Sequence, residues 1–126
     1  MDGEIDPAGL AALLEEGGDV RIVDIRDERA FGRGHVPDSE SIPFPELTTR
    51  VAELEGADRI VTVCPHGIAS RQAAQLIGSY EGTANARVES LRGGIEAWQE
   101  EGHELEAAAE DGDGSGEDDE GPDAPF

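Results

Sequence analysis

Apolar residues recur with strand and helix periodicity along the first hundred residues of this chain. Short β-branched runs predict strands, and apolar positions three or four apart predict helices. The predicted strands cover 20–25, 41–43, 59–63 and 87–91. The predicted helices cover 7–17, 27–32, 47–54, 70–80 and 94–101. Because strands and helices alternate, the pattern predicts an α/β fold with a parallel sheet and helical crossovers.

The pattern ends near residue 106. Beyond this point the chain consists almost entirely of Ala, Gly, Asp, Glu and Pro, which offer almost nothing to bury. Such composition is typical of a disordered segment. We therefore predict one domain over residues 1–106 and an acidic disordered tail over 107–126. At 126 residues, the length allows one modest core and one site.

The net charge of −21 is extreme and has two parts. Residues 1–103 hold 20 acids against 9 arginines, and residues 104–126 hold 10 acids and no base. Without lysine or a basic cluster, nucleic-acid binding is excluded. A carboxylate-rich body is typical of salt-loving archaea, because molar salt shortens the Debye length to about 3 Å. We favour such a host over a functional acidic surface. The acidic tail supports a separate hypothesis, a charged interaction protein, which deletion of 107–126 tests.

The amino terminus carries neither the basic segment nor the apolar segment of a signal peptide. No apolar stretch has the length of a membrane span. The single cysteine, Cys64, cannot form a disulfide within the chain, which agrees with a reducing compartment. We therefore expect a cytoplasmic protein without membrane partners.

Cys64 lies in the segment VTVCPHGIAS, where the strand 59–63 gives way to a helix expected from Ser70. Ligands of parallel α/β sheets bind beyond the carboxyl ends of strands, and a helix N-terminus stabilises a thiolate there. Gly67 would let the N–H groups of residues 66–70 point at one anionic centre. From these residues alone, Cys64 is either a nucleophile in an anion-binding loop or a buried structural thiol.

Three segments resemble the rhodanese (sulfurtransferase) domain in the right order. The loop CPHGIAS resembles its active-site loop, in which glycine follows the cysteine at the third position and serine at the sixth. VDIRDERAFGRGHVPDSESIP resembles its upstream Asp-x-Arg and Gly-His-Ile-Pro pattern, and LRGGIEAWQEEGHELE its closing Gly-Gly and Ala-Trp segment. Together the three cover residues 5–106.

This resemblance implies a rhodanese-like three-layer fold and sulfur transfer without a cofactor. Cys64 would take a sulfane sulfur from thiosulfate or a persulfide donor, carry it as a persulfide, and pass it to a thiol or protein acceptor. The residues implied to bind the anion are His66, Gly67, Ile68, Ala69 and Ser70. The supporting residues are Asp24 and Arg26, expected to form a structural ion pair, and His35, expected to fix a loop by a hydrogen bond.

The loop also departs from the family pattern. Pro65 stands where many members carry a basic residue and offers no N–H, and Ala69 stands where many carry arginine. These departures motivate the alternatives of a non-catalytic binding module or a protein-to-protein sulfur relay without thiosulfate activity. A cysteine phosphatase is disfavoured, because its loop arginine is needed at the position of Ser70, whereas Arg71 is one residue later and is expected on the helix surface.

The remaining candidates carry less chemistry. His66 is either a donor to the sulfur anion or an exposed loop residue, and His103 is expected at the surface. Trp98 is expected in the core. The scattered histidines and single cysteine lack zinc-ligand spacing, so we expect no metal.

Overall fold

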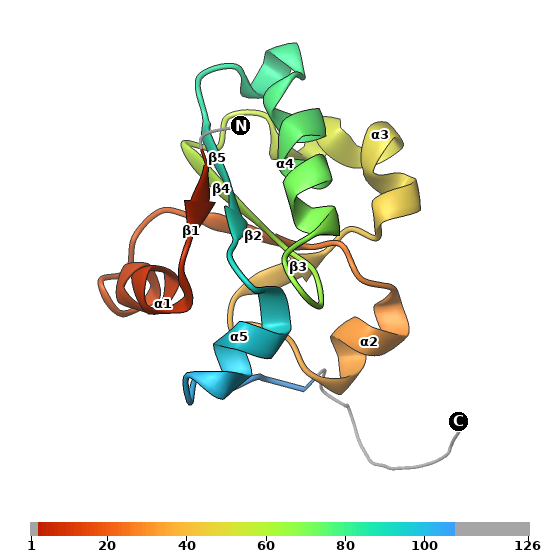
Figure 1. Ribbon diagram of the computed structural model, residues 1–126. Helices are drawn as coiled ribbons and strands as arrows, with labels where there is room; N and C mark the ends of the chain where they lie inside the picture. Colours follow the sequence, from red (N-terminus) through yellow and green to blue (C-terminus); the bar gives the residue numbers. More distant parts are fainter. Residues whose placement is uncertain (1–2, 108–126) are drawn as a thin grey trace.

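Five parallel strands form one sheet in the computed structural model, which describes residues 3–107 (Figure 1). The strand order is β1-β5-β4-β2-β3. The strands are β1 Glu4–Ile5, β2 Arg21–Asp24, β3 Ser39–Ser41, β4 Arg59–Val63 and β5 Arg87–Leu91. The predicted parallel α/β sheet is thus confirmed. Apart from Ala107, the predicted acidic tail lies outside the described residues.

Residues 3–107 also form five α-helices and three short 3₁₀ helices, of which all but α5 precede the last strand. The α-helices are α1 Pro7–Glu15, α2 Glu28–Arg33, α3 Leu47–Arg50, α4 Ala69–Gly78 and α5 Gly94–Glu100. The 3₁₀ helices are η1 Phe44–Glu46, η2 Val51–Leu54 and η3 Glu81–Thr83. The Asp6 side chain accepts a hydrogen bond from the Gly9 N–H, which confirms the predicted N-cap of the first helix.

The period-two pattern of the central strands builds a core on each face of the sheet. Ile60 and Val23 belong to the cluster that includes residues of α3, η2 and α4. Their neighbours Val61 and Ile22 belong to the opposite cluster, which includes residues of α1 and α5. Helices therefore cover both faces, which gives the expected three layers (Figure 1). Trp98 is buried in the second cluster, as predicted.

The structure corrects four details of the sequence prediction. The strand expected at 41–43 lies at Ser39–Ser41, and β1 was not predicted. The helix expected over 47–54 is split into α3 and η2. His103 is half-buried rather than exposed, because its ring packs against Trp98 with the two ring centroids 4.5 Å apart.

Candidate active site

Cys64 directly follows β4, at the carboxyl edge of the sheet. The loop from Cys64 leads into α4, which begins at Ala69, one residue before the predicted start. The first turn of this helix therefore adjoins the cysteine, with the positive end of the helix dipole directed towards the loop. Figure 1 shows the loop between the end of β4 and α4, near the start of α5. The topology thus brings a thiol to the place where parallel α/β sheets bind ligands.

The Cys64 sulfur is buried and faces several hydrogen-bond donors. The Gly67 N–H donates to Sγ at 3.0 Å, and the hydroxyl of Ser70 lies 3.3 Å from Sγ. Burial by itself raises the pKa of the Cys64 thiol, but hydrogen bonds from the Ser70 hydroxyl and from the backbone of Ser70, His66 and Gly67 outweigh burial. The net effect holds the pKa of Cys64 below its ordinary value, which favours the nucleophilic thiolate.

Two glycines let the loop and α5 meet at this point. Gly67 has φ +83° and Gly94 has φ +62°, a region that disfavours side chains. A Cβ added to Gly94 would lie 2.2 Å from the Cys64 carbonyl oxygen. Because the backbones approach so closely, the Ile95 N–H donates to the Cys64 carbonyl at 2.9 Å, and the next N–H of α5 donates to the Pro65 carbonyl at 3.0 Å. Gly94 therefore allows the start of α5 to hold the cysteine loop in place through two backbone hydrogen bonds.

The other loop side chains do not surround the sulfur. His66 is exposed, and its Nδ1 pairs with the Glu96 carboxylate at 3.1 Å. Ile68 is 63% exposed, and Ala69 is half-buried. Their side chains therefore do not contact the sulfur, and only a backbone group of this set, the N–H of His66, contributes to lowering the pKa of Cys64.

A pocket of about 320 Å³ opens beside the loop, between Pro65, His66 and α5. Two carboxylates, Glu96 and Glu100, and one guanidinium, Arg26, also line this pocket. The charge of Arg26 is compensated, because its side chain is paired with Asp24. The carboxylates of Glu100 and of Glu96, which is hydrogen-bonded to His66, therefore make the pocket acidic.

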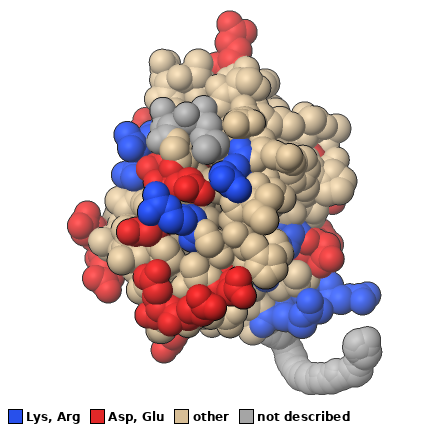
Figure 2. Space-filling model, in the orientation of Figure 1, with Lys and Arg blue, Asp and Glu red and all other residues tan. Residues whose placement is uncertain are grey.

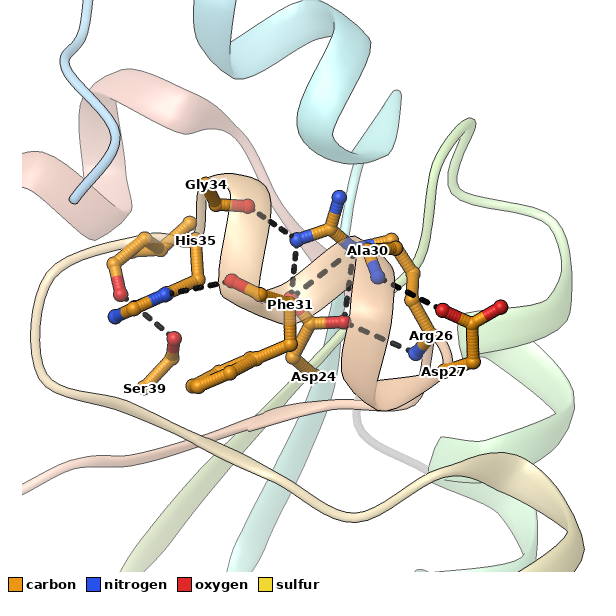
Figure 3. A network of polar contacts seen from close by, with 9 residues as sticks. Asp24, Arg26, Asp27, Ala30, Phe31, Gly34, His35 and Ser39 are labelled. Carbon is orange, nitrogen blue, oxygen red and sulfur yellow. Dashed lines mark hydrogen bonds and ion pairs between the residues drawn. The ribbon is translucent and has the colours of Figure 1, made fainter. Parts of the chain in front are cut away.

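Asp24 and Arg26 form a tight ion pair at the end of β2, of which Asp24 is the last residue (Figure 3). Asp24 is fully buried. Its carboxylate accepts hydrogen bonds of 2.8–3.1 Å from the Nε, the Nη2 and the backbone N–H of Arg26. The same Nη2 donates to the Gly34 carbonyl at 2.6 Å. The pair ties the end of β2 to the end of α2, and its guanidinium also reaches the pocket wall.

His35 belongs to the same structural cluster and not to the cysteine loop. Its Nδ1 lies 2.9 Å from the Phe31 carbonyl oxygen, and its ring stacks on the Phe31 ring with centroids 4.0 Å apart. Its backbone pairs with Glu106 in an isolated bridge, which connects the end of α2 to the last described segment. These contacts are those of a residue that fixes a loop.

Two residues near the sulfur were not singled out in the sequence. Ser90, on β5, is fully buried, and its hydroxyl lies 2.6 Å from that of Ser70. Thr62, on β4, donates to the Ser70 carbonyl at 2.6 Å. The available signal was the presence of hydroxyls at positions of buried strands where apolar residues are usual. Arg71 is exposed on α4, as the sequence predicts.

Charged side chains are unevenly spread over the face of the molecule seen in Figure 2. Acidic side chains gather over its lower part, where Figure 1 places α5, and arginines lie over α2 at the lower right.

Within residues 3–107, no set of three His, Cys, Asp or Glu side chains could hold a metal ion. Over the same residues, no helix is both long and apolar enough to span a membrane.

Comparison with known proteins agrees with this fold. The family model of the rhodanese-like domain matches residues 6–101, and the chain belongs to this family. A sulfurtransferase of Allochromatium vinosum is 36% identical over 102 residues, which are 81% of this chain and 92% of that protein. The thiosulfate sulfurtransferase GlpE of Pseudomonas syringae is 34% identical over 95 residues, 75% of this chain and 85% of that protein.

Solved structures give the same result. A crystal structure of a thiosulfate sulfurtransferase from Pseudomonas aeruginosa has a TM-score of 0.75 and 26% identity, covering 85% of this chain and 20% of that longer chain. The rhodanese-like fold implied by the three sequence segments is thereby confirmed. The comparisons do not support the halophilic archaeal host, which stays a prediction from charge alone.

Proposed function

We propose that this protein is a sulfurtransferase that carries a sulfane sulfur on Cys64 as a persulfide. The observation that supports it best is the convergence on one buried sulfur of donors that lower the pKa of its thiol. The lone cysteine is suited to a reducing compartment, and we assign the protein to the cytoplasm.

The reaction needs two displacements at sulfur. The Cys64 thiolate attacks the sulfane sulfur of the donor, a new S–S bond forms, and the donor's bond breaks with its electron pair leaving on sulfite or on a thiolate. The outer sulfur of the resulting persulfide is anionic, so the backbone N–H groups of Gly67 and its neighbours stabilise it. An acceptor thiolate then attacks this outer sulfur, and the Cys64 thiolate is regenerated as the leaving group.

The charges around the site favour a persulfide donor over thiosulfate. Thiosulfate is a dianion, and the adjoining pocket is lined by the carboxylates of Glu100 and of Glu96, the second of which is hydrogen-bonded to His66. The loop offers no arginine, and Arg26 is occupied by Asp24 and the Gly34 carbonyl. Like charges raise the cost of bringing a dianion to the sulfur. A relay that is loaded by a persulfide is therefore the form of the function that this pocket favours.

Intact-mass spectrometry tests the proposal. The protein is incubated in turn with thiosulfate and with cysteine persulfide, whose net negative charge is smaller, beside a Cys64→Ser variant, and then treated with cyanide. We expect a gain of one sulfur atom on the wild type only, faster from the persulfide, and its removal by cyanide as thiocyanate. If neither donor adds sulfur to folded protein, the chain is a rhodanese-like binding module and the proposal is wrong.

A further inference from the structure

A second buried hydroxyl, that of Ser90, contacts the Ser70 hydroxyl from β5, the strand next to β4. Ser90 belongs to β5, and both serines are fully buried. Their hydroxyl oxygens are 2.6 Å apart, a strong hydrogen bond in which either oxygen could be the donor. The Ser70 oxygen is in turn 3.3 Å from the sulfur of Cys64. The three side chains therefore form a continuous line from the sheet to the nucleophile.

The direction of these hydrogen bonds follows from counting protons. Among residues 3–107, the Ser70 hydroxyl is the only hydrogen-bond partner of the Ser90 hydroxyl. Each hydroxyl has one proton, and a buried O–H needs an acceptor. Ser90 therefore donates to Ser70, and the proton of Ser70 is left to point at the sulfur.

The opposite direction leaves a proton without an acceptor. If Cys64 were a thiol donating to Ser70, the Ser70 proton would turn to Ser90. The Ser90 proton would then have no acceptor within the described residues, at a cost comparable to a lost hydrogen bond. The line of hydroxyls is fully satisfied when the sulfur accepts from Ser70, a role that a thiolate or an anionic persulfide fills better than the weakly accepting thiol.

We propose that Ser90 is a positioning residue that directs the Ser70 hydroxyl proton towards the sulfur of Cys64. It acts through Ser70 and does not touch the reacting atoms. The proposal rests on the proposed function for its purpose, because a thiolate is what sulfur transfer needs. The low pKa of the Cys64 thiol, to which the Ser70 hydroxyl contributes, agrees with it.

The experiment follows the reactivity of the thiol itself. Cys64 is the only cysteine, so iodoacetamide alkylation measured from pH 5 to 10 reports its thiolate fraction without background. The variants are Ser90→Ala, Ser70→Ala and the double variant, with circular dichroism to verify folding. Ser41→Ala is the matched control, because Ser41 also lies on the sheet with a buried hydroxyl, one that has no partner among the described residues.

We expect Ser90→Ala to slow alkylation at neutral pH about threefold and to move the midpoint of the pH profile upwards. In the Ser70→Ala background, removal of Ser90 should change nothing further, and Ser41→Ala should match the wild type. An unchanged profile in Ser90→Ala, or an equal effect with and without Ser70, would overturn the proposal.

The result is separable from the proposed function. If Ser90 governs the pH profile but no donor loads Cys64, sulfur transfer is wrong and the positioning role stands. If donors load Cys64 at the same rate in Ser90→Ala as in the wild type, with the same pH profile, only the positioning role is wrong.

Discussion

Two polar clusters lie side by side at the carboxyl edge of the sheet, one at the end of β2 and one after the neighbouring β4. In the first, Asp24 and Arg26 satisfy each other and the Gly34 carbonyl. In the second, donors from the loop converge on Cys64, the nucleophile that we propose. The topology offers both positions equally to ligands. The comparison teaches that the two clusters differ in how fully their polar groups are paired and not in their place on the sheet. A cluster whose polar groups are all paired is suited to a structural role.

The largest effect is expected where the cysteine loop meets α5. Gly94→Ala would place a methyl group 2.2 Å from the Cys64 carbonyl oxygen at φ +62°, so the loop must move. We expect a loss of about 4 kcal/mol in the free energy of unfolding, together with loss of sulfur loading. Denaturant unfolding measures it. Gly17→Ala is the control, because Gly17 has φ +70° but open space, and should lose about 1 kcal/mol. Equal losses would refute the role of the close approach.

The Asp24–Arg26 ion pair should affect the stability of the fold and not the reactivity of the Cys64 thiol. Asp24→Asn leaves the nearly buried Arg26 without its counter-charge, and we expect a loss of about 3 kcal/mol in the free energy of unfolding. The alkylation rate of Cys64 in the folded variant should stay close to that of the wild type. Arg50→Ala, which removes an exposed ion-pair partner, should lose much less stability. A large fall in thiol reactivity in Asp24→Asn would erase the distinction between the two clusters.

Ser70→Ala should have the opposite pattern and lower the reactivity of the Cys64 thiol. Removing its hydroxyl raises the pKa of Cys64, so the thiolate fraction at neutral pH falls and alkylation slows about fivefold. Because the folded pKa lies below that of an unfolded cysteine, thiolate formation stabilises the fold at high pH. This contribution is lost as the pH falls through the folded pKa. The pH dependence of unfolding should therefore be weaker in Ser70→Ala, and an identical dependence in both proteins would contradict the argument.

The smallest effect concerns the choice of donor. Neutralising the pocket with Glu96→Gln and Glu100→Gln should raise kcat/KM for thiosulfate about threefold at low salt and leave it unchanged in molar salt. Glu15→Gln with Glu16→Gln removes the same total charge from the end of α1 and should have no such effect. If the two double variants raise kcat/KM for thiosulfate equally, the net charge of the protein, and not the charge of the pocket, determines the choice of donor.

The sequence predicts most of the fold because its central strands are local features. RIVTV and RVESL coincide with β4 and β5. β1 is two residues long and exists only through its pairing with β5, more than eighty residues away, so no local pattern marks it. β3 is displaced to the half-exposed Ser39–Ser41, because its pairing with β2 and not its apolarity makes it a strand.

The proposed nucleophile and its loop can be predicted from the sequence, but the contacts that support the loop cannot. The position of Cys64 between a strand and a helix is visible in the sequence, and so is the need for Gly67. The Ser90 hydroxyl and the N–H groups of α5 reach the loop only through the tertiary fold. No spacing along the chain encodes them, and Ser90 is distinguished only by its polarity within a buried strand.

The grip of α5 on the cysteine loop has a consequence for how the chain matures. A ribosome delivers Cys64 some thirty residues before Gly94 and Ile95, whose close approach and N–H groups hold the loop in shape. Ser90 also emerges later. Until these residues arrive, the cysteine is an ordinary thiol on a nascent chain, because the loop is not yet held in the shape that lowers its pKa. We therefore expect the lowered pKa to appear only in the completed domain.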